Sequence, residues 1–308
     1  LNDPRYINPP ESGYGLDSQW TDEFHHALRV AAGQERSGYY ADFDGILHLG
    51  KAYRDAYVYD GQFSPHRKKT FGMPAENNPG KQFVVFSQNH DQVGNRMLGE
   101  RTGRLVSREM QKLLAGAVLC SPYLPMLFMG EEWGETSPFL YFVDHSDPEL
   151  KEAVRKGRTE EFSAFHAAGE APDPNDEQTY LRSRLRWELL ENGEHQGMFR
   201  YYRELIRLRT SNAVLRVPDR KKLNVDVDEA AGTLVLHRWQ DQEHVLILMN
   251  FSKNPRPITV SGFAREWIRR FDSASPEWMG PAGAPERVAG LESVELQPES
   301  ILIYTNTP

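Results

Sequence analysis

Cysteine is almost absent from this chain of 308 residues, in which Cys120 stands alone. One thiol excludes a disulfide within the chain and any metal site built from cysteines, and it fits a reducing compartment. Long apolar runs are absent too. Leu113 to Cys120 is among the longest, far short of the roughly 20 residues that a membrane-spanning helix needs. The sequence therefore predicts no membrane segment.

An excess of positive charge is also missing. Lysine and arginine number 36 against 44 aspartates and glutamates, which gives a net charge of −8. Such a chain is a poor partner for phosphate backbones and anionic lipids, so we expect neither nucleic acid nor a membrane as a partner. Glycine-rich nucleotide loops and the G-x-S-x-G elbow of serine hydrolases do not occur either. We therefore expect no cofactor.

The stretch from Asp22 to His26 is the one that invites a metal interpretation. Neighbouring residues of a helix point about 100° apart, whereas metal-binding histidine pairs on a helix are usually four residues apart. His25 and His26 are adjacent, and only Asp22 and His25 could share a face. We predict no metal site and expect one histidine to face a cleft and the other the core or solvent.

Three segments repeat one pattern, a short apolar run that ends in polar residues and precedes a helix. The predicted strands are 15–20, 83–86 and 124–129, and the predicted helices are 22–31, 107–119 and 198–209. Thr21 is the expected N-cap of the first helix, and 144–194 is expected to be loop and short helix. Alternating strands and helices are typical of a parallel sheet, with the chemistry after the strands. We predict an α/β fold for residues 1–216, with about three of the eight units that a (β/α)8 TIM barrel needs. That these units are the C-terminal part of such a barrel is what the family resemblance given below implies.

Composition changes after about Val217. Five stretches there resemble strands separated by turn residues, at 222–227, 233–239, 245–250, 257–260 and 300–304. Strands joined by short polar turns are typical of an antiparallel sheet. We predict a small antiparallel β-sandwich domain over residues 217–308.

Two polar clusters follow the predicted strands. Asn89-His90-Asp91-Gln92 brings a carboxylate, an imidazole and two amides together, a set that can hold sugar hydroxyls and stabilise a positively charged transition state. The alternative is a helix or turn cap, because Asn and Asp favour such positions. In Glu131-Glu132-Trp133 the adjacent carboxylates point different ways, so one of them faces a cleft or the cluster is a solvated acidic turn.

Several motifs resemble a known family when read in order. They are LNDPR at 1–5, GYGLDSQW at 13–20, DEFHHAL at 22–28, GYYADF at 38–43, QNHDQVGNR at 88–96 and LFMGEEW at 127–133. The NHD trio resembles the last signature region of the α-amylase superfamily (glycoside hydrolase family 13). The whole series resembles the maltooligosyltrehalose trehalohydrolases of that superfamily. The resemblance is specific over residues 1–133 and weaker beyond.

This resemblance implies a retaining glycosidase that cleaves the α-1,4 bond next to the terminal trehalose of a maltooligosyltrehalose. Asp91 matches the catalytic aspartate that stabilises the transition state, and His90 matches a histidine that contacts the glucose ring. The nucleophile Asp and the acid/base Glu of the family fall before Leu1, so we expect the chain to be an excised or partly given piece of a longer protein.

The resemblance also implies further substrate contacts at the ends of the strands. Besides His90, these predicted contacts are Asn89, Gln92, Asn95, Arg96, Trp20, Asp22, His25, Glu131 and Trp133. It implies α-1,4-glucan oligosaccharides as ligands, a cytoplasmic location and a maltooligosyltrehalose synthase that acts before this enzyme in the pathway.

Two alternatives remain open at this point. An α-glucan branching enzyme would usually carry Ser and Glu where this chain has Asn89 and Gln92, which favours the hydrolase. A catalytically incomplete glucan-binding piece is the second alternative, because the resemblance places two of the three catalytic groups outside the chain.

Overall fold

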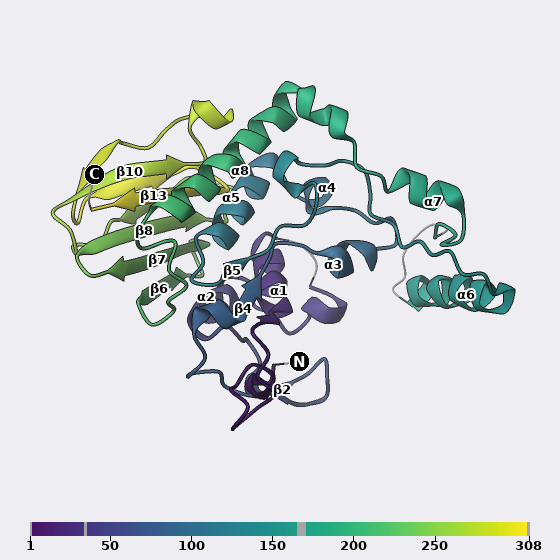
Figure 1. Ribbon diagram of the computed structural model, residues 1–308. Coiled ribbons are helices and arrows are strands. Elements are labelled where there is room, and N and C mark those ends of the chain that lie inside the picture. Colours follow the sequence, from purple (N-terminus) through teal and green to yellow (C-terminus); the bar gives the residue numbers. More distant parts are fainter. Residues whose placement is uncertain (1, 34–35, 165–170, 307–308) are drawn as a thin grey trace. The chain divides into compact units, whose positions relative to one another are not determined.

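The computed structural model describes residues 2–33, 36–164 and 171–306 (Figure 1). The chain divides into two compact units. The first unit comprises Leu1–Ser87, Arg108–Met126 and Arg200–Pro308, and the second comprises Gln88–Ser107 and Leu127–Phe199. The domain boundary predicted after residue 216 stays a prediction. No described helix has the length and the apolar character that crossing a membrane requires.

The first unit contains a short parallel sheet. Its strands are β1 (Gln19–Trp20), β4 (Phe83–Val85) and β5 (Leu124–Pro125), in the order β1-β4-β5. This confirms the predicted parallel α/β arrangement, whereas a closed barrel is not seen in the described residues. The outer strands are shorter than predicted, and Pro125, which has no N–H to donate to a ladder, is the last residue of β5.

Helices follow the parallel strands in the first unit. They are α1 (Asp22–Ala31), α2 (Ile46–Asp55), α5 (Arg108–Leu119) and the part of α8 (Gly193–Ser211) from Arg200 onward. The predicted limits of α1 are confirmed. Thr21 does occupy its N-cap position, but its side chain makes no capping hydrogen bond. Helix α2 and the hairpin of β2 (Asp60–Ser64) and β3 (Lys69–Gly72) that follows it were not predicted from the sequence.

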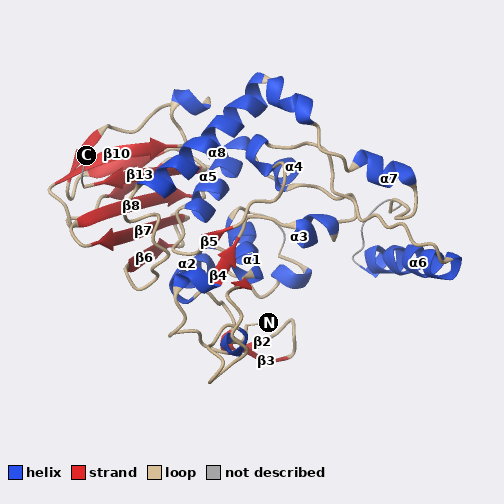
Figure 2. Ribbon diagram, viewed as in Figure 1, coloured by secondary structure: helices blue, strands red, loops and turns tan. Residues whose placement is uncertain are grey.

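The C-terminal part of the first unit is an antiparallel β-domain (Figure 2). Six strands pair in the order β11-β10-β13-β8-β7-β6, and two more pair as β12-β9. The strands are β6 (Leu223–Asp228), β7 (Thr233–Gln240), β8 (Glu243–Asn250), β9 (Arg256–Thr259), β10 (Glu266–Asp272), β11 (Arg287–Ala289), β12 (Ser293–Leu296) and β13 (Ser300–Thr305). The five predicted strands are confirmed, and β10, β11 and β12 were missed. A core around Trp267, Leu248 and Leu302 lies between these strands and includes Leu296 from β12.

Buried cations attach the β-domain to the helices of the first unit. Lys112 on α5 is buried and donates hydrogen bonds to the carbonyl oxygens of Ser273 and Trp278, at 2.7 and 3.1 Å. Arg238 on β7 donates to the carbonyl oxygen of Cys120 just after α5, at 3.0 Å. These contacts satisfy main-chain oxygens that the helix and the loops leave unpaired.

The second unit consists of helices and loops. Its α-helices are α3 (His90–Gly94), α4 (Thr102–Leu105), α6 (Pro148–Ala164), α7 (Glu177–Arg182) and the start of α8. Single 3-10 turns in the two units are η1 (Pro4–Tyr6), η2 (Gly38–Tyr40), η3 (Gly80–Gln82), η4 (Glu131–Trp133), η5 (Trp187–Glu191) and η6 (Pro276–Trp278). The region 144–194 contains loop and short helices as predicted, but α6 is a helix of 17 residues.

Candidate active site

The first unit carries three of the predicted site residues at the end of β1 and just after it. Trp20 is 45% exposed, and its ring meets the edge of Phe86 with centroids 6.0 Å apart. Asp22, in the first turn of α1, is exposed. These two side chains lie at the carboxyl end of a parallel strand, where α/β proteins place their ligands.

His25 is fully buried and is held on both sides. Its Nδ1 lies 2.6 Å from the carbonyl oxygen of Ser87, and its Nε2 lies 3.0 Å from the hydroxyl of Tyr40. A carbonyl only accepts, so Nδ1 carries the proton and Nε2 accepts from Tyr40. Burial lowers the pKa of His25 well below 6.5, which keeps the ring neutral. This geometry favours a supporting role over the predicted contact with substrate.

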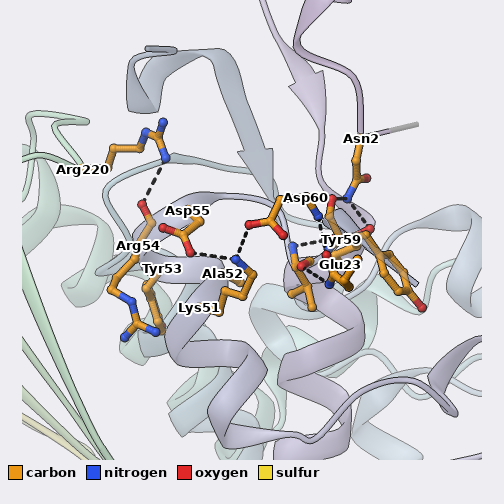
Figure 3. Close-up of polar contacts among 12 residues, drawn as sticks. Asn2, Glu23, Lys51, Ala52, Tyr53, Arg54, Asp55, Tyr59, Asp60 and Arg220 are labelled. Carbon is orange, nitrogen blue, oxygen red and sulfur yellow. Dashed lines mark hydrogen bonds and ion pairs between the residues drawn. The ribbon is translucent and has the colours of Figure 1, made fainter. Parts of the chain in front are cut away.

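Glu23 is a buried acid that was not among the predicted site residues (Figure 3). Its Oε2 accepts hydrogen bonds from the backbone N–H groups of Val58 and Tyr59, at 2.6 and 2.8 Å, and its Oε1 accepts from the side chain of Asn2. Burial raises its pKa from 4.5 to about 7. Glu23 therefore ties α1 to the start of the chain and to the segment before β2.

The predicted polar cluster of the second unit contains both buried and exposed side chains. Asn89 is buried, and its Oδ1 accepts from the backbone N–H groups of Asp91 and Gln92, at 2.8 and 3.2 Å. It is thus the N-cap of α3, the alternative considered for this motif. The side chains of His90 and Asp91 are 55% and 62% exposed, with His90 Nε2 3.4 Å from Asp91 Oδ1. The carboxylate of Asp91 is therefore accessible to a ligand.

The residues after Asp91 lie along the same short helix. Gln92 is half-buried, Asn95 is exposed at the C-cap of α3, and Arg96 is half-buried. The Nε of Arg96 donates to Glu100 at 3.3 Å. Within the second unit the structure brings these predicted residues together on one turn and its helix.

Glu131 and Trp133, predicted after the third strand, are both buried. Oε2 of Glu131 accepts hydrogen bonds from Gln88 Nε2 at 3.3 Å and from the backbone N–H of Phe128 at 3.1 Å. The Trp133 ring packs against Trp187 with centroids 4.9 Å apart. Burial favours supporting roles for both side chains. It also contradicts the alternative, in which this cluster is a solvated acidic turn.

Two buried polar residues of the second unit were not predicted as site residues. Gln88 bonds to Glu131, and its Oε1 also accepts from the backbone N–H of Thr102 at 3.0 Å. Arg101 donates to the carbonyl oxygens of Ser137 and Met129, at 2.8 and 2.7 Å. Gln88 directly precedes the predicted motif, but no pattern in the sequence marks Arg101.

The chemistry available in the described residues is that of carboxylates and hydrogen-bonding groups. No group of three or more His, Cys, Asp or Glu side chains that could hold a metal ion occurs among them. Cys120 is buried, which raises its pKa to about 12 and leaves it a protonated thiol rather than a nucleophile. Asp91 and Asp22 are exposed carboxylates that follow β4 and β1 in the chain.

Comparison with known proteins identifies sequence relatives of this chain. The chain is 40% identical over 265 residues to the malto-oligosyltrehalose trehalohydrolase of Mycobacterium tuberculosis, which covers 85% of this chain and 45% of that protein. Over 210 residues it is 45% identical to the malto-oligosyltrehalose trehalohydrolase of Saccharolobus solfataricus, covering 68% of this chain and 36% of that protein. The chain is homologous to the malto-oligosyltrehalose trehalohydrolases. It spans less than half the length of these curated relatives.

A solved structure agrees with the α-amylase relationship. A candidate alpha amylase from Salmonella typhimurium superposes with a TM-score of 0.80 at 31% identity, over 95% of this chain and 47% of that one. The alpha-amylase from H. orenii, at 18% identity and a TM-score of 0.56, shares the fold over 98% of this chain and 51% of its own. Residues 224–303 match a family described as a domain of unknown function (DUF3459). The resemblance inferred from the sequence motifs is thus confirmed.

Proposed function

We propose that the protein hydrolyses the α-1,4-glucosidic bond next to the terminal trehalose unit of a maltooligosyltrehalose and releases trehalose. The proposal is carried by one observation, the exposed Asp91 carboxylate after β4 in a chain homologous to trehalohydrolases over 85% of its length. Positive charge develops on the sugar ring in the transition state, and a fixed carboxylate beside it lowers the energy of that state.

Exposed side chains supply the substrate contacts in this proposal. His90 binds the glucose ring at the cleavage site, and Trp20 offers a ring face for stacking. Further hydrogen bonds come from the remaining polar side chains that are accessible, namely Asp22, Gln92, Asn95 and Arg96. The buried residues among the predicted contacts, His25, Asn89, Glu131 and Trp133, hold these groups in place.

A retaining mechanism needs a nucleophile and an acid/base besides Asp91. The proposal assigns both to residues that precede Leu1, on earlier strands of a (β/α)8 barrel in which β1, β4 and β5 are the last strands. A maltooligosyltrehalose synthase, which rearranges the reducing-end linkage of a maltooligosaccharide, supplies the substrate.

The test is Asp91→Asn in the longest polypeptide that contains this chain. Loss of the charge should lower kcat for trehalose release from maltooligosyltrehalose by at least about 100-fold, because a charge that acts in the transition state is removed. The KM should change far less. Asp144→Asn is the matched control, since that side chain is fully exposed and contacts only Lys151 at 3.8 Å among the ion pairs described.

Trehalose and transfer products are measured together by chromatography. Release of trehalose that survives Asp91→Asn at the wild-type rate contradicts the role of Asp91. Formation of branched glucan without trehalose favours the branching enzyme instead.

A further inference from the structure

We propose that Gln88, Glu131 and Arg101 form a brace that fixes the turn carrying Asp91. The inference rests on the proposed function of Asp91 and assigns Gln88, Glu131 and Arg101 as positioning residues. All three side chains are buried in the second unit, with exposed fractions of 4%, 6% and 2%. Gln88 and Glu131 bind each other, and Arg101 binds carbonyl oxygens through its Nε and Nη1.

Gln88 is the centre of the brace. Its amide oxygen accepts the backbone N–H of Thr102 at 3.0 Å, and its amide nitrogen donates to Glu131 Oε2 at 3.3 Å. Because the oxygen accepts a hydrogen bond and the nitrogen donates one, the orientation of the amide is fixed. The next residue, Asn89, caps α3 through the backbone N–H groups of Asp91 and Gln92. The backbone that presents Asp91 is therefore held by two consecutive side-chain amides.

Glu131 connects this turn to the loop after β5. The same oxygen that accepts from Gln88 also accepts the backbone N–H of Phe128 at 3.1 Å. A buried carboxylate that accepts hydrogen bonds from a backbone N–H and a side-chain amide has a structural role. Its chemical task in the brace is acceptance of hydrogen bonds, which a glutamine oxygen can also perform.

Arg101 closes the loop that contains Glu131. Its Nε and Nη1 donate to the carbonyl oxygens of Ser137 and Met129, at 2.8 and 2.7 Å, on the two sides of Glu131 in the chain. Its guanidinium also lies over the Phe128 ring, 4.9 Å from the ring centroid. Since Arg101 adjoins Thr102, whose N–H binds Gln88, the arginine joins both halves of the brace.

The test exchanges the two partners of the central hydrogen bond. Gln88→Glu still accepts from Thr102 but sets a second carboxylate against Glu131, so we expect kcat for trehalose release to fall by about 10- to 100-fold. Glu131→Gln alone keeps the acceptor oxygen and should lower kcat by less than about threefold. In the double variant the glutamine at 131 donates to the glutamate at 88, and kcat should recover to within about fivefold of wild type. Gln178→Glu, an exposed site on α7, is the matched control.

A purely structural loss is separated from positioning by two further measurements. Gln88→Met removes both hydrogen bonds without adding charge, and it should lower kcat more than it raises KM while the protein stays folded at the assay temperature. The unfolding midpoint of each variant is recorded in parallel. The brace is overturned if Gln88→Glu and Gln88→Met both turn over like wild type, or if the folded double variant stays as slow as Gln88→Glu.

A failure of the proposed function can be distinguished from a failure of the brace. If the unmutated protein releases no trehalose, the proposed function fails. The midpoints then still decide the brace, because the double variant should recover at least about half of the stability that Gln88→Glu loses. No recovery overturns the coupling of residues 88 and 131.

Discussion

Glu23 makes the stability of the protein depend on pH in an unusual direction. Burial raises its pKa from 4.5 to about 7, against the hydrogen bonds from Tyr59, Val58 and Asn2 that favour the charged form. The folded state thus binds this proton more tightly than the unfolded chain does. The stability that this proton contributes to the folded state is fully present below about pH 4.5 and is lost as the pH rises through about 7. The difference between 4.5 and about 7 corresponds to about 3–4 kcal/mol at most, since one pKa unit is worth about 1.4 kcal/mol.

Glu23→Gln removes the titration and keeps an oxygen for the backbone N–H groups of Val58 and Tyr59. The free energy of unfolding is measured by urea denaturation, followed by tryptophan fluorescence, at several values between pH 4.5 and 8. We expect wild type to exceed the variant by about 2–3 kcal/mol more at pH 4.5 than at pH 8. The exposed Glu177→Gln is the matched control and should follow wild type. A difference that stays constant within about 0.5 kcal/mol over this range refutes the reasoning.

Three further predictions concern other buried or absent groups. Lys112→Met leaves the Ser273 and Trp278 carbonyl oxygens and Glu109 without their donor, so thermal unfolding should show a loss of about 2–4 kcal/mol. Burial lowers the pKa of His237 to about 4. The free energy of unfolding that the neutral ring contributes is therefore present above about pH 6.5 and falls towards about pH 4. His237→Leu should flatten the pH dependence of stability over this range. EDTA should leave trehalose release unchanged; inhibition reversed by a metal would contradict this.

Local patterns were enough to predict much of the secondary structure. Helices α1 and α5 and five strands of the β-domain were predicted. Their signals lie within a few neighbouring residues of the chain. The strands β10, β11 and β12 were missed, since Glu266–Asp272 is rich in charge and the other two have only three and four residues. The helix α6 was missed because its 17 residues are largely polar and give little apolar periodicity.

The roles within the candidate site depended more strongly on tertiary structure. The motif around Asp91 predicted a polar cluster, but only the structure separates the exposed His90 and Asp91 from the buried cap Asn89. Likewise, His25 and Glu131 have the residue types of substrate contacts. Ser87 and Tyr40, however, bind the two ring nitrogens of His25, and Gln88 and Phe128 both bind Oε2 of Glu131.

The sequence by itself predicted the resemblance to the trehalohydrolases, the parallel α/β arrangement of the first part of the chain and several antiparallel strands of the last part. These follow from short motifs and from spacing along the chain. Only the tertiary structure decided which polar side chains face solvent and which bind distant backbone groups, as Glu23 does with Val58 and Tyr59. The physical reason is that burial and hydrogen-bond partners depend on residues far apart in the chain, and a local pattern does not contain that information.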